Sequence, residues 1–215
     1  MTNKVSRRDL LKQAAVVGAA AAVPLGSAAC VPSASTERTW ETLTESEGET
    51  LEAIVARLIP SDDSGPGATE ARAARYIDRG LGGGLASSRE AYRVGLAAVD
   101  RYAGSSKGGR FSRLTADDQD EVLRDMEDDR ATGFTLSAAA FFGLLRTHTI
   151  QGTFSDPAYG GNDDFIGWEL IGYPGVRTAV TPDLQRMDVA PTARQVSAYD
   201  FPAFADSKAG RTHGG

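Results

Sequence analysis

Few side chains in this sequence could perform acid–base or nucleophilic chemistry. Its 215 residues include two histidines and one cysteine. His213 lies in a glycine-rich end, and Cys30 lies where an export signal would be processed. Nucleophilic catalysis needs a Ser or Cys beside a base and an orienting acid. His148 follows Leu144 by four residues on an apolar helical pattern, which favours packing at a helix end over a role as that base.

Carboxylates are the other candidates, because adjacent aspartates occur at four places. Metal binding or glycosidase chemistry would need acids that converge within a few ångströms, whereas neighbours on a helix point in different directions. We therefore interpret most of these pairs as helix caps and solvated faces. Only the last pair lies beside a motif of glycines and aromatic residues. The four pairs are Asp62-Asp63, Asp117-Asp118, Asp128-Asp129 and Asp163-Asp164.

Composition excludes several classes of function. A single cysteine excludes an internal disulfide, a cysteine-based zinc site and an iron–sulfur cluster ligated by this chain alone. The net charge of −6 and the pI of about 5.0 argue against a nucleic-acid partner, which requires a basic surface. The sequence also contains no dinucleotide fingerprint after a strand and no Walker A motif.

The N-terminal residues 1–30 have the pattern of an export signal. Arg7 and Arg8, followed by two leucines and a lysine, resemble the twin-arginine export motif. An uncharged, alanine-rich run then leads to a cleavage region of small residues. Two processing routes remain open: cleavage near Ala29, or lipidation of Cys30 at a lipoprotein-type site. Residues 31–43, rich in Pro, Ser and Thr at their start, are predicted to be a spacer.

The elements after the spacer are predicted to be all-α: about five helices in a small irregular bundle, residues 44–175. Capping signals, the 3.6-residue spacing of apolar side chains, and the glycines and prolines that follow define these helices. The last helix is the most apolar, so it is predicted to be central. The helices run from Thr44 to before Pro60, from Ala68 to about Leu81, from Ser87 or Ser88 to before Gly104, from Thr115 through Met126, and from Thr135 to about Thr149.

Residues 176–215 are predicted to form a long, mostly irregular C-terminal arm. A structureless segment of this length is uncommon inside a compact domain. Apolar residues nevertheless recur along it, which favours an arm held extended against another surface over a disordered tail. They are Val180, Leu184, Met187, Val189, Tyr199, Phe201 and Phe204.

The segment Thr149–Asn162, continued by Gly167-Trp168 and Gly172-Tyr173-Pro174-Gly175, resembles the signature of the gluconate 2-dehydrogenase subunit 3 family. The resemblance extends upstream through Ile59–Asp63, Pro66–Ala68 and Tyr76–Asp78. It implies a small, exported, non-catalytic subunit of a membrane-associated dehydrogenase. It also implies an FAD-containing large subunit as partner, a cytochrome c subunit carrying haem c in some complexes, and passage through the twin-arginine translocase to the periplasm. No catalytic, cofactor or metal residue is expected in this chain.

We expect partner contacts from the aromatic and turn residues of this motif and of the arm. Rigid aromatic side chains on glycine-containing loops make good interface anchors. The alternative is that the motif folds back and packs on the helices of its own chain. The predicted interface residues are Phe154, Tyr159, Asn162, Trp168, Tyr173, Pro174, Tyr199 and Phe201.

Two other functions fit parts of the same segment. A stand-alone hydrolase or lyase would require four side chains to converge in one pocket. A periplasmic sugar-binding module would instead use an exposed stacking platform of Trp168, Tyr173 and Asn162. The four side chains that the hydrolase needs are His148, Asp156, Tyr159 and Asp163.

Overall fold

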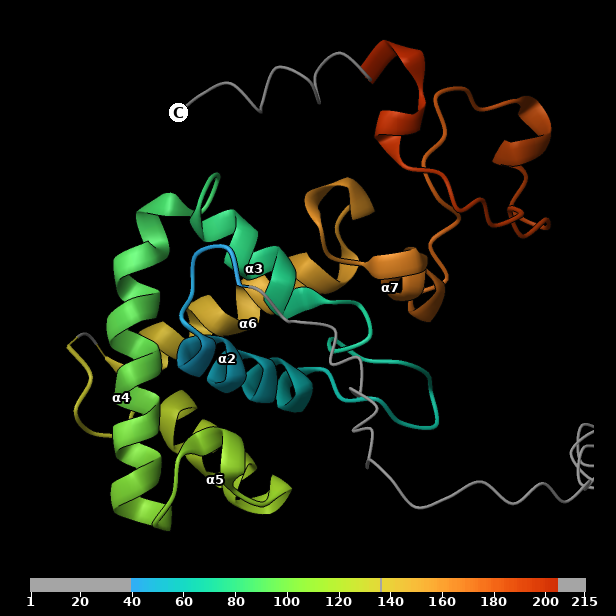
Figure 1. Cartoon of the computed structure of the whole chain (residues 1–215). Helices are drawn as coiled ribbons and strands as arrows, with labels where there is room; N and C mark the ends of the chain where they lie inside the picture. Colours follow the sequence, from blue (N-terminus) through green and yellow to red (C-terminus); the bar gives the residue numbers. More distant parts are fainter. Residues whose placement is uncertain (1–39, 136, 205–215) are drawn as a thin grey trace, which may run out of the picture. The chain divides into compact units, whose positions relative to one another are not determined.

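The computed structural model describes residues 40–135 and 137–204, and this part of the chain is all-α, as predicted (Figure 1). Arg7, Arg8, Cys30 and His213 lie outside the described residues. No β-strand occurs within them, and short 3₁₀-helices join the α-helices. The α-helices are α2 (Glu45–Leu58), α3 (Ala73–Leu81), α4 (Arg89–Lys107), α5 (Ala116–Glu127), α6 (Ala138–Phe154) and α7 (Ile166–Leu170).

Local sequence signals fix where two of these helices begin. The Thr44 hydroxyl accepts a hydrogen bond from the backbone N–H of Glu47, and the Glu47 carboxylate accepts one from the backbone N–H of Thr44. This is the predicted capping box, which satisfies backbone donors that have no partner inside the helix. At the start of α5 the Thr115 hydroxyl accepts a hydrogen bond from the backbone N–H of Asp118 and donates one to the Asp118 carboxylate.

The predicted bounds of three helices are wrong. α3 begins at Ala73 instead of Ala68, because Arg72 adopts the left-handed conformation with φ of 55° and interrupts the helical pattern. α4 continues past Gly104 and ends at the left-handed Gly108. α6 begins after its N-cap at Ser137 and runs to Phe154, five residues beyond the predicted end.

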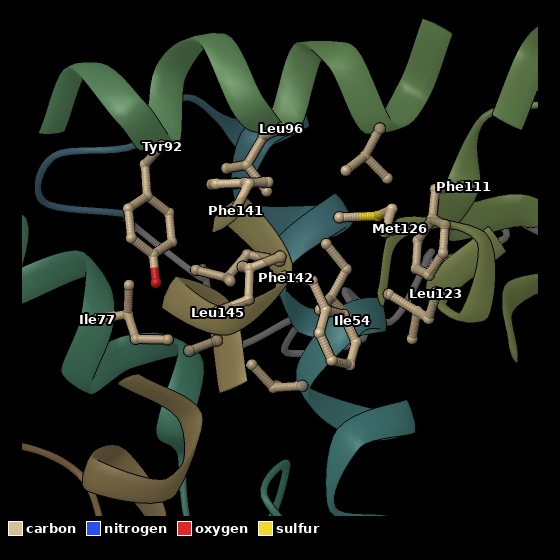
Figure 2. Close-up of a cluster of buried hydrophobic side chains, with 14 of the residues drawn as sticks. Ile54, Ile77, Tyr92, Leu96, Phe111, Leu123, Met126, Phe141, Phe142 and Leu145 are labelled. Atoms are coloured by element: carbon tan, nitrogen blue, oxygen red, sulfur yellow. The ribbon is translucent and has the colours of Figure 1, made fainter. Parts of the chain in front are cut away.

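The most apolar helix is the central one, as predicted. α6 contacts α2, α3, α5 and α7. Figure 2 shows side chains of α6 among those of the surrounding helices. Burying each leucine-sized side chain contributes about 1.5–3 kcal/mol to folding. The labelled side chains of this core are Ile54, Ile77, Tyr92, Leu96, Phe111, Leu123, Met126, Phe141, Phe142 and Leu145.

A buried carboxylate ties the residues before α2 to α3. Asp78 is only 1% exposed and accepts hydrogen bonds from three successive backbone N–H groups, at 2.7, 2.9 and 2.9 Å. These N–H groups belong to Glu41, Thr42 and Leu43, the end of the predicted spacer. A charged group can be buried here because hydrogen bonds replace its lost water. We call residues 40–149 the helical body.

Candidate interaction site

The glycine-rich block, residues 152–175, folds back onto the end of α6. The backbone N–H of Asn162 donates to the carbonyl oxygen of Gly152 at 2.8 Å. A Cβ placed on Gly161 would stand 2.1 Å from that same carbonyl oxygen, and a Cβ on Gly167 would stand 1.8 Å from the carbonyl oxygen of Thr153. No other residue fits at such distances, so glycine at these two positions permits the backbones to approach.

Asn162 holds the block together from the inside. Its side chain is fully buried and joins two backbone groups, donating from Nδ2 to the carbonyl oxygen of Ser155 and accepting at Oδ1 from the N–H of Gly167, both at 2.8 Å. Asn162 itself adopts the left-handed conformation with φ of 45°, which asparagine tolerates better than most residues. Its position inside the block makes it a structural residue of this chain.

Trp168 is also turned inward. It is 6% exposed, and its indole N–H donates to the carbonyl oxygen of Phe154 at 2.9 Å. Its ring lies against those of Phe165 and Tyr173, with centroids 5.2 and 4.9 Å apart. The stacking platform that a sugar-binding module would need is therefore not exposed at Trp168, because the chain's own aromatic rings and backbone cover it.

The entry to α7 is strained. Asp164 and Phe165 adopt the left-handed conformation with φ of 53° and 61°, only two and three residues after Asn162. A non-glycine residue in a sparsely populated conformation costs about 1–3 kcal/mol and persists only where its surroundings enforce it. The buried Trp168 and Asn162 provide those surroundings. The sequence did not predict α7, because this helix is only five residues long, contains Gly167 and has no side-chain cap.

The four residues of the hydrolase alternative are each bonded to a different partner. His148 is 6% exposed and its Nδ1 lies 3.0 Å from the Tyr92 hydroxyl, with the two rings stacked. Burial lowers the pKa of His148 and raises the pKa of Tyr92. The remaining three residues bind elsewhere: Asp156 to Ser197, Tyr159 to Tyr199, and Asp163 to Arg72.

These partners leave no base, acid and nucleophile together in one pocket. A cavity of about 150 Å³ lies between α4 and α6, lined by Val94, Phe141 and Leu144 among others, and no acid or base lines it. Within residues 40–135 and 137–204, no group of three or more His, Cys, Asp or Glu side chains is arranged to hold a metal ion. The four residues of the hydrolase alternative are therefore not gathered at one site within the described residues.

The arm is attached to the block at two points, which we call clasps. In the first clasp, the backbone N–H of Arg194 donates to the carbonyl oxygen of Pro174 at 2.9 Å. Gly175 permits this approach, because its φ is 85° and a Cβ on it would stand 1.9 Å from the Arg194 carbonyl oxygen. The chain therefore leaves the block at Pro174 and returns to the same place about twenty residues later.

The second clasp centres on the Asp156 carboxylate. It accepts hydrogen bonds from the Ser197 hydroxyl at 2.7 Å and from the backbone N–H of Ala198 at 2.8 Å. Beside it, the hydroxyls of Tyr159 and Tyr199 lie 2.9 Å apart and their rings meet edge to face. Sequence reasoning missed this clasp. The pattern Ser197-x-x-Asp200, a capping box, signals the local turn but not its attachment to Asp156.

The structure divides the predicted interface residues into three groups. Asn162 and Trp168 are buried inside the chain. Tyr159 and Tyr173 are exposed by 42% and 41%, and each also contacts another aromatic ring of its own chain. The others are half-buried: Phe154, Pro174, Tyr199 and Phe201. Their contact with a partner stays a prediction.

Exposed large apolar side chains gather in one part of the chain. In the part that the structure describes, all of them lie in residues 150–204, and none lies in residues 40–149. Several such side chains close together on one segment are typical of an interaction site. They are Ile150, Tyr159, Ile171, Tyr173, Val180, Leu184, Met187, Val189 and Phe204.

Comparison with known families identifies the family of the chain. The sequence profile of the family described as gluconate 2-dehydrogenase subunit 3 matches residues 45–175, and the chain belongs to this family. A twin-arginine translocation pathway signal sequence matches residues 4–24, which supports export. No curated protein and no solved structure matches the chain. None of the helices in the described ranges is long and apolar enough to span a membrane.

Proposed function

We propose that this chain is the non-catalytic small subunit of an FAD-dependent dehydrogenase that oxidises a sugar or an alcohol. Its role is to stabilise the flavoprotein large subunit and to escort it, already folded, through twin-arginine export to the periplasm. The family match supports membership of a dehydrogenase complex, and the signal sequence supports the export route. FAD belongs to the large subunit in this proposal, and haem c to a cytochrome subunit where the complex has one.

The confinement of exposed apolar side chains to residues 150–204 carries this proposal. A helical body that buries its large apolar residues needs no partner for its own stability. The C-terminal segment, in contrast, exposes side chains that gain free energy when a second protein covers them. Substrate specificity would then reside in the large subunit.

Export provides the sharpest test, because one signal would serve two proteins. Replacing Arg7 and Arg8 together with lysine keeps the charge and removes the arginine pair. We expect both this chain and the flavoprotein to be lost from the periplasm, measured as dehydrogenase activity and protein-bound flavin in the periplasmic fraction. Lys12→Arg is the matched control and should export both. Periplasmic flavoprotein in the absence of the arginine pair would contradict the escort role.

Stability is tested separately, by co-expressing the large subunit with and without this chain in the cytoplasm. We expect the large subunit to retain more FAD and to unfold at a higher temperature when the chain is present. Equal flavin content and equal Tm in both preparations would contradict the stabilising role and leave the export role unaffected.

A further inference from the structure

We propose that the arm loop, residues 176–193, is a preformed hook that inserts apolar side chains into a pocket of the flavoprotein large subunit. This inference rests on the proposed function and names the element that makes the contact. Residues 178–193 are exposed without interruption. Met187 is fully exposed, and Val180, Val189 and Leu184 are exposed by 56%, 49% and 37%.

Both ends of the arm loop are fixed to the block. The first clasp joins Pro174 to Arg194, and the second joins Asp156 to Ser197 and Ala198. Gln195 adds a third tie, since its Nε2 donates to the Glu169 carboxylate at 2.5 Å. A loop closed in this way is not a free tail, because its start and its end are anchored to the same folded block.

Contacts within the arm loop also restrict its shape. Residues Pro182–Gln185 form a 3₁₀-helix, the Arg186 guanidinium pairs with Asp188 at 2.6 Å, and Arg177 donates to the carbonyl oxygen of Thr192 at 2.5 Å. These contacts lie on either side of Leu184 and Met187 and reduce the conformations open to the arm loop. Preorganisation of this kind lowers the entropy that is lost when a loop binds its partner.

The charges of the arm loop favour a protein partner over a lipid surface. The loop contains two arginines and two aspartates, so its net charge is zero, and it contains no Trp, Tyr or Phe. Membrane-binding segments combine a basic face with aromatic or leucine-rich insertion. Exposed Leu, Met and Val within a neutral, polar loop instead match the apolar centre and polar rim of a protein interface.

The test uses two substitutions and a neighbouring control in the exported, tagged chain co-expressed with its large subunit. Leu184→Asp and Met187→Asp place a charge where the hook would enter a pocket. Gln185→Asp adds the same charge to an exposed polar position between them. We expect about tenfold less bound flavoprotein for the first two than for Gln185→Asp, measured as flavin absorbance per chain, as for the loss of a hot spot.

The outcomes separate this inference from the proposed function. Flavin bound equally by Leu184→Asp, Met187→Asp and Gln185→Asp, with wild-type chain also binding it, would overturn the hook and leave the accessory role standing. Wild-type chain purified without any flavoprotein would overturn the accessory role and the hook with it. All three positions are exposed, so the substitutions should leave the helical body folded. Circular dichroism of each variant verifies this.

Protection of the arm loop in the complex gives an independent readout. Trypsin should cleave the isolated chain after Arg186, whose side chain is 56% exposed, and cleave it more slowly in the flavoprotein complex. Cleavage at an equal rate in both would overturn the hook. Two other results would also overturn the hook. If Met187→Asp alone lost binding to phosphatidylcholine–phosphatidylglycerol vesicles, the arm loop would bind a membrane. If it alone lost self-association, the arm loop would bind a second copy of the chain.

Discussion

The helical body and the C-terminal segment of residues 150–204 are built on different principles. In the helical body, large apolar side chains from α2 to α6 are buried together around α6 (Figure 2). In the C-terminal segment, glycines, two clasps and buried polar groups hold the backbone, while side chains such as Met187 and Ile171 face solvent. The helical body is held mainly by apolar burial, whereas hydrogen bonds hold the C-terminal segment and leave apolar side chains on its surface.

This difference separates two requirements on one short chain. A subunit of a complex needs a body that folds without its partner. It also needs a surface whose apolar side chains stay exposed after folding. Hydrogen bonds made by the Asn162 side chain, and those that the Asp156 carboxylate accepts, order the segment without burying its exposed apolar side chains. Such bonds each contribute only about 1 kcal/mol net, so they set geometry more than stability.

The largest expected effect on stability is that of a substitution in the helical body. Leu145→Ala removes a fully buried side chain at the centre of α6 and should lower the free energy of unfolding by about 2–5 kcal/mol. Ile150→Ala, on the same helix but 44% exposed and in the C-terminal segment, should change it by less than about 0.5 kcal/mol. Urea denaturation of both variants measures the difference. Equal losses would erase the distinction between the two regions.

The next effect tests whether glycines hold the block. Gly167→Ala would place a Cβ 1.8 Å from a backbone carbonyl oxygen and should cost about 1–3 kcal/mol, since the backbones must separate. Gly143→Ala, in α6 with nothing within 4 Å of its Cβ, should instead stabilise the chain by about 0.5–1 kcal/mol. Thermal unfolding of the Gly167→Ala and Gly143→Ala variants measures the two changes in stability. A stable Gly167→Ala variant would show that the close approach is dispensable.

A third, smaller effect is a pH dependence of the free energy of unfolding that arises at His148 in the helical body. Burial lowers the pKa of His148 below its usual 6.5, so the unfolded chain binds this proton more readily than the folded chain. The free energy of unfolding should therefore be highest above about pH 6.5 and fall as the pH drops below it. Denaturation at several pH values should show a weaker dependence in His148→Gln and an unchanged one in His213→Gln. The reverse pattern would contradict the assignment.

The smallest effect on global stability is expected at the second clasp. Ser197→Ala removes a hydroxyl that donates to Asp156, and it should change the free energy of global unfolding by less than about 0.5 kcal/mol. Local opening should nevertheless increase by about fivefold, the equivalent of one hydrogen bond. Tryptic cleavage after Arg194 measures that opening, with Thr181→Ala as the control within the arm. Unchanged cleavage would mean that the clasp does not hold the arm.

The sequence alone determined the helical body well, because its signals are local. The capping box at Thr44 and the apolar spacing of Leu51, Ile54 and Val55 act within a few residues, and the structure confirms both. The family resemblance and the export signal were likewise readable from contiguous motifs and are confirmed by the profile matches. The end of α6 was misjudged because Thr149 and Thr153 donate to helix carbonyls in a buried setting, which no local pattern reveals.

Only the tertiary structure decided the arrangement of the C-terminal segment. From the sequence, Trp168 and Tyr173 have equal claims to a surface position, yet one is 6% exposed and the other 41%. No sequence pattern predicts that Phe165 adopts the left-handed conformation. None predicts that the Ser197 hydroxyl donates to the Asp156 carboxylate, 41 residues earlier in the chain. The physical reason is that helices are specified by neighbours three and four residues apart, whereas this segment is held by contacts between residues far apart in the chain.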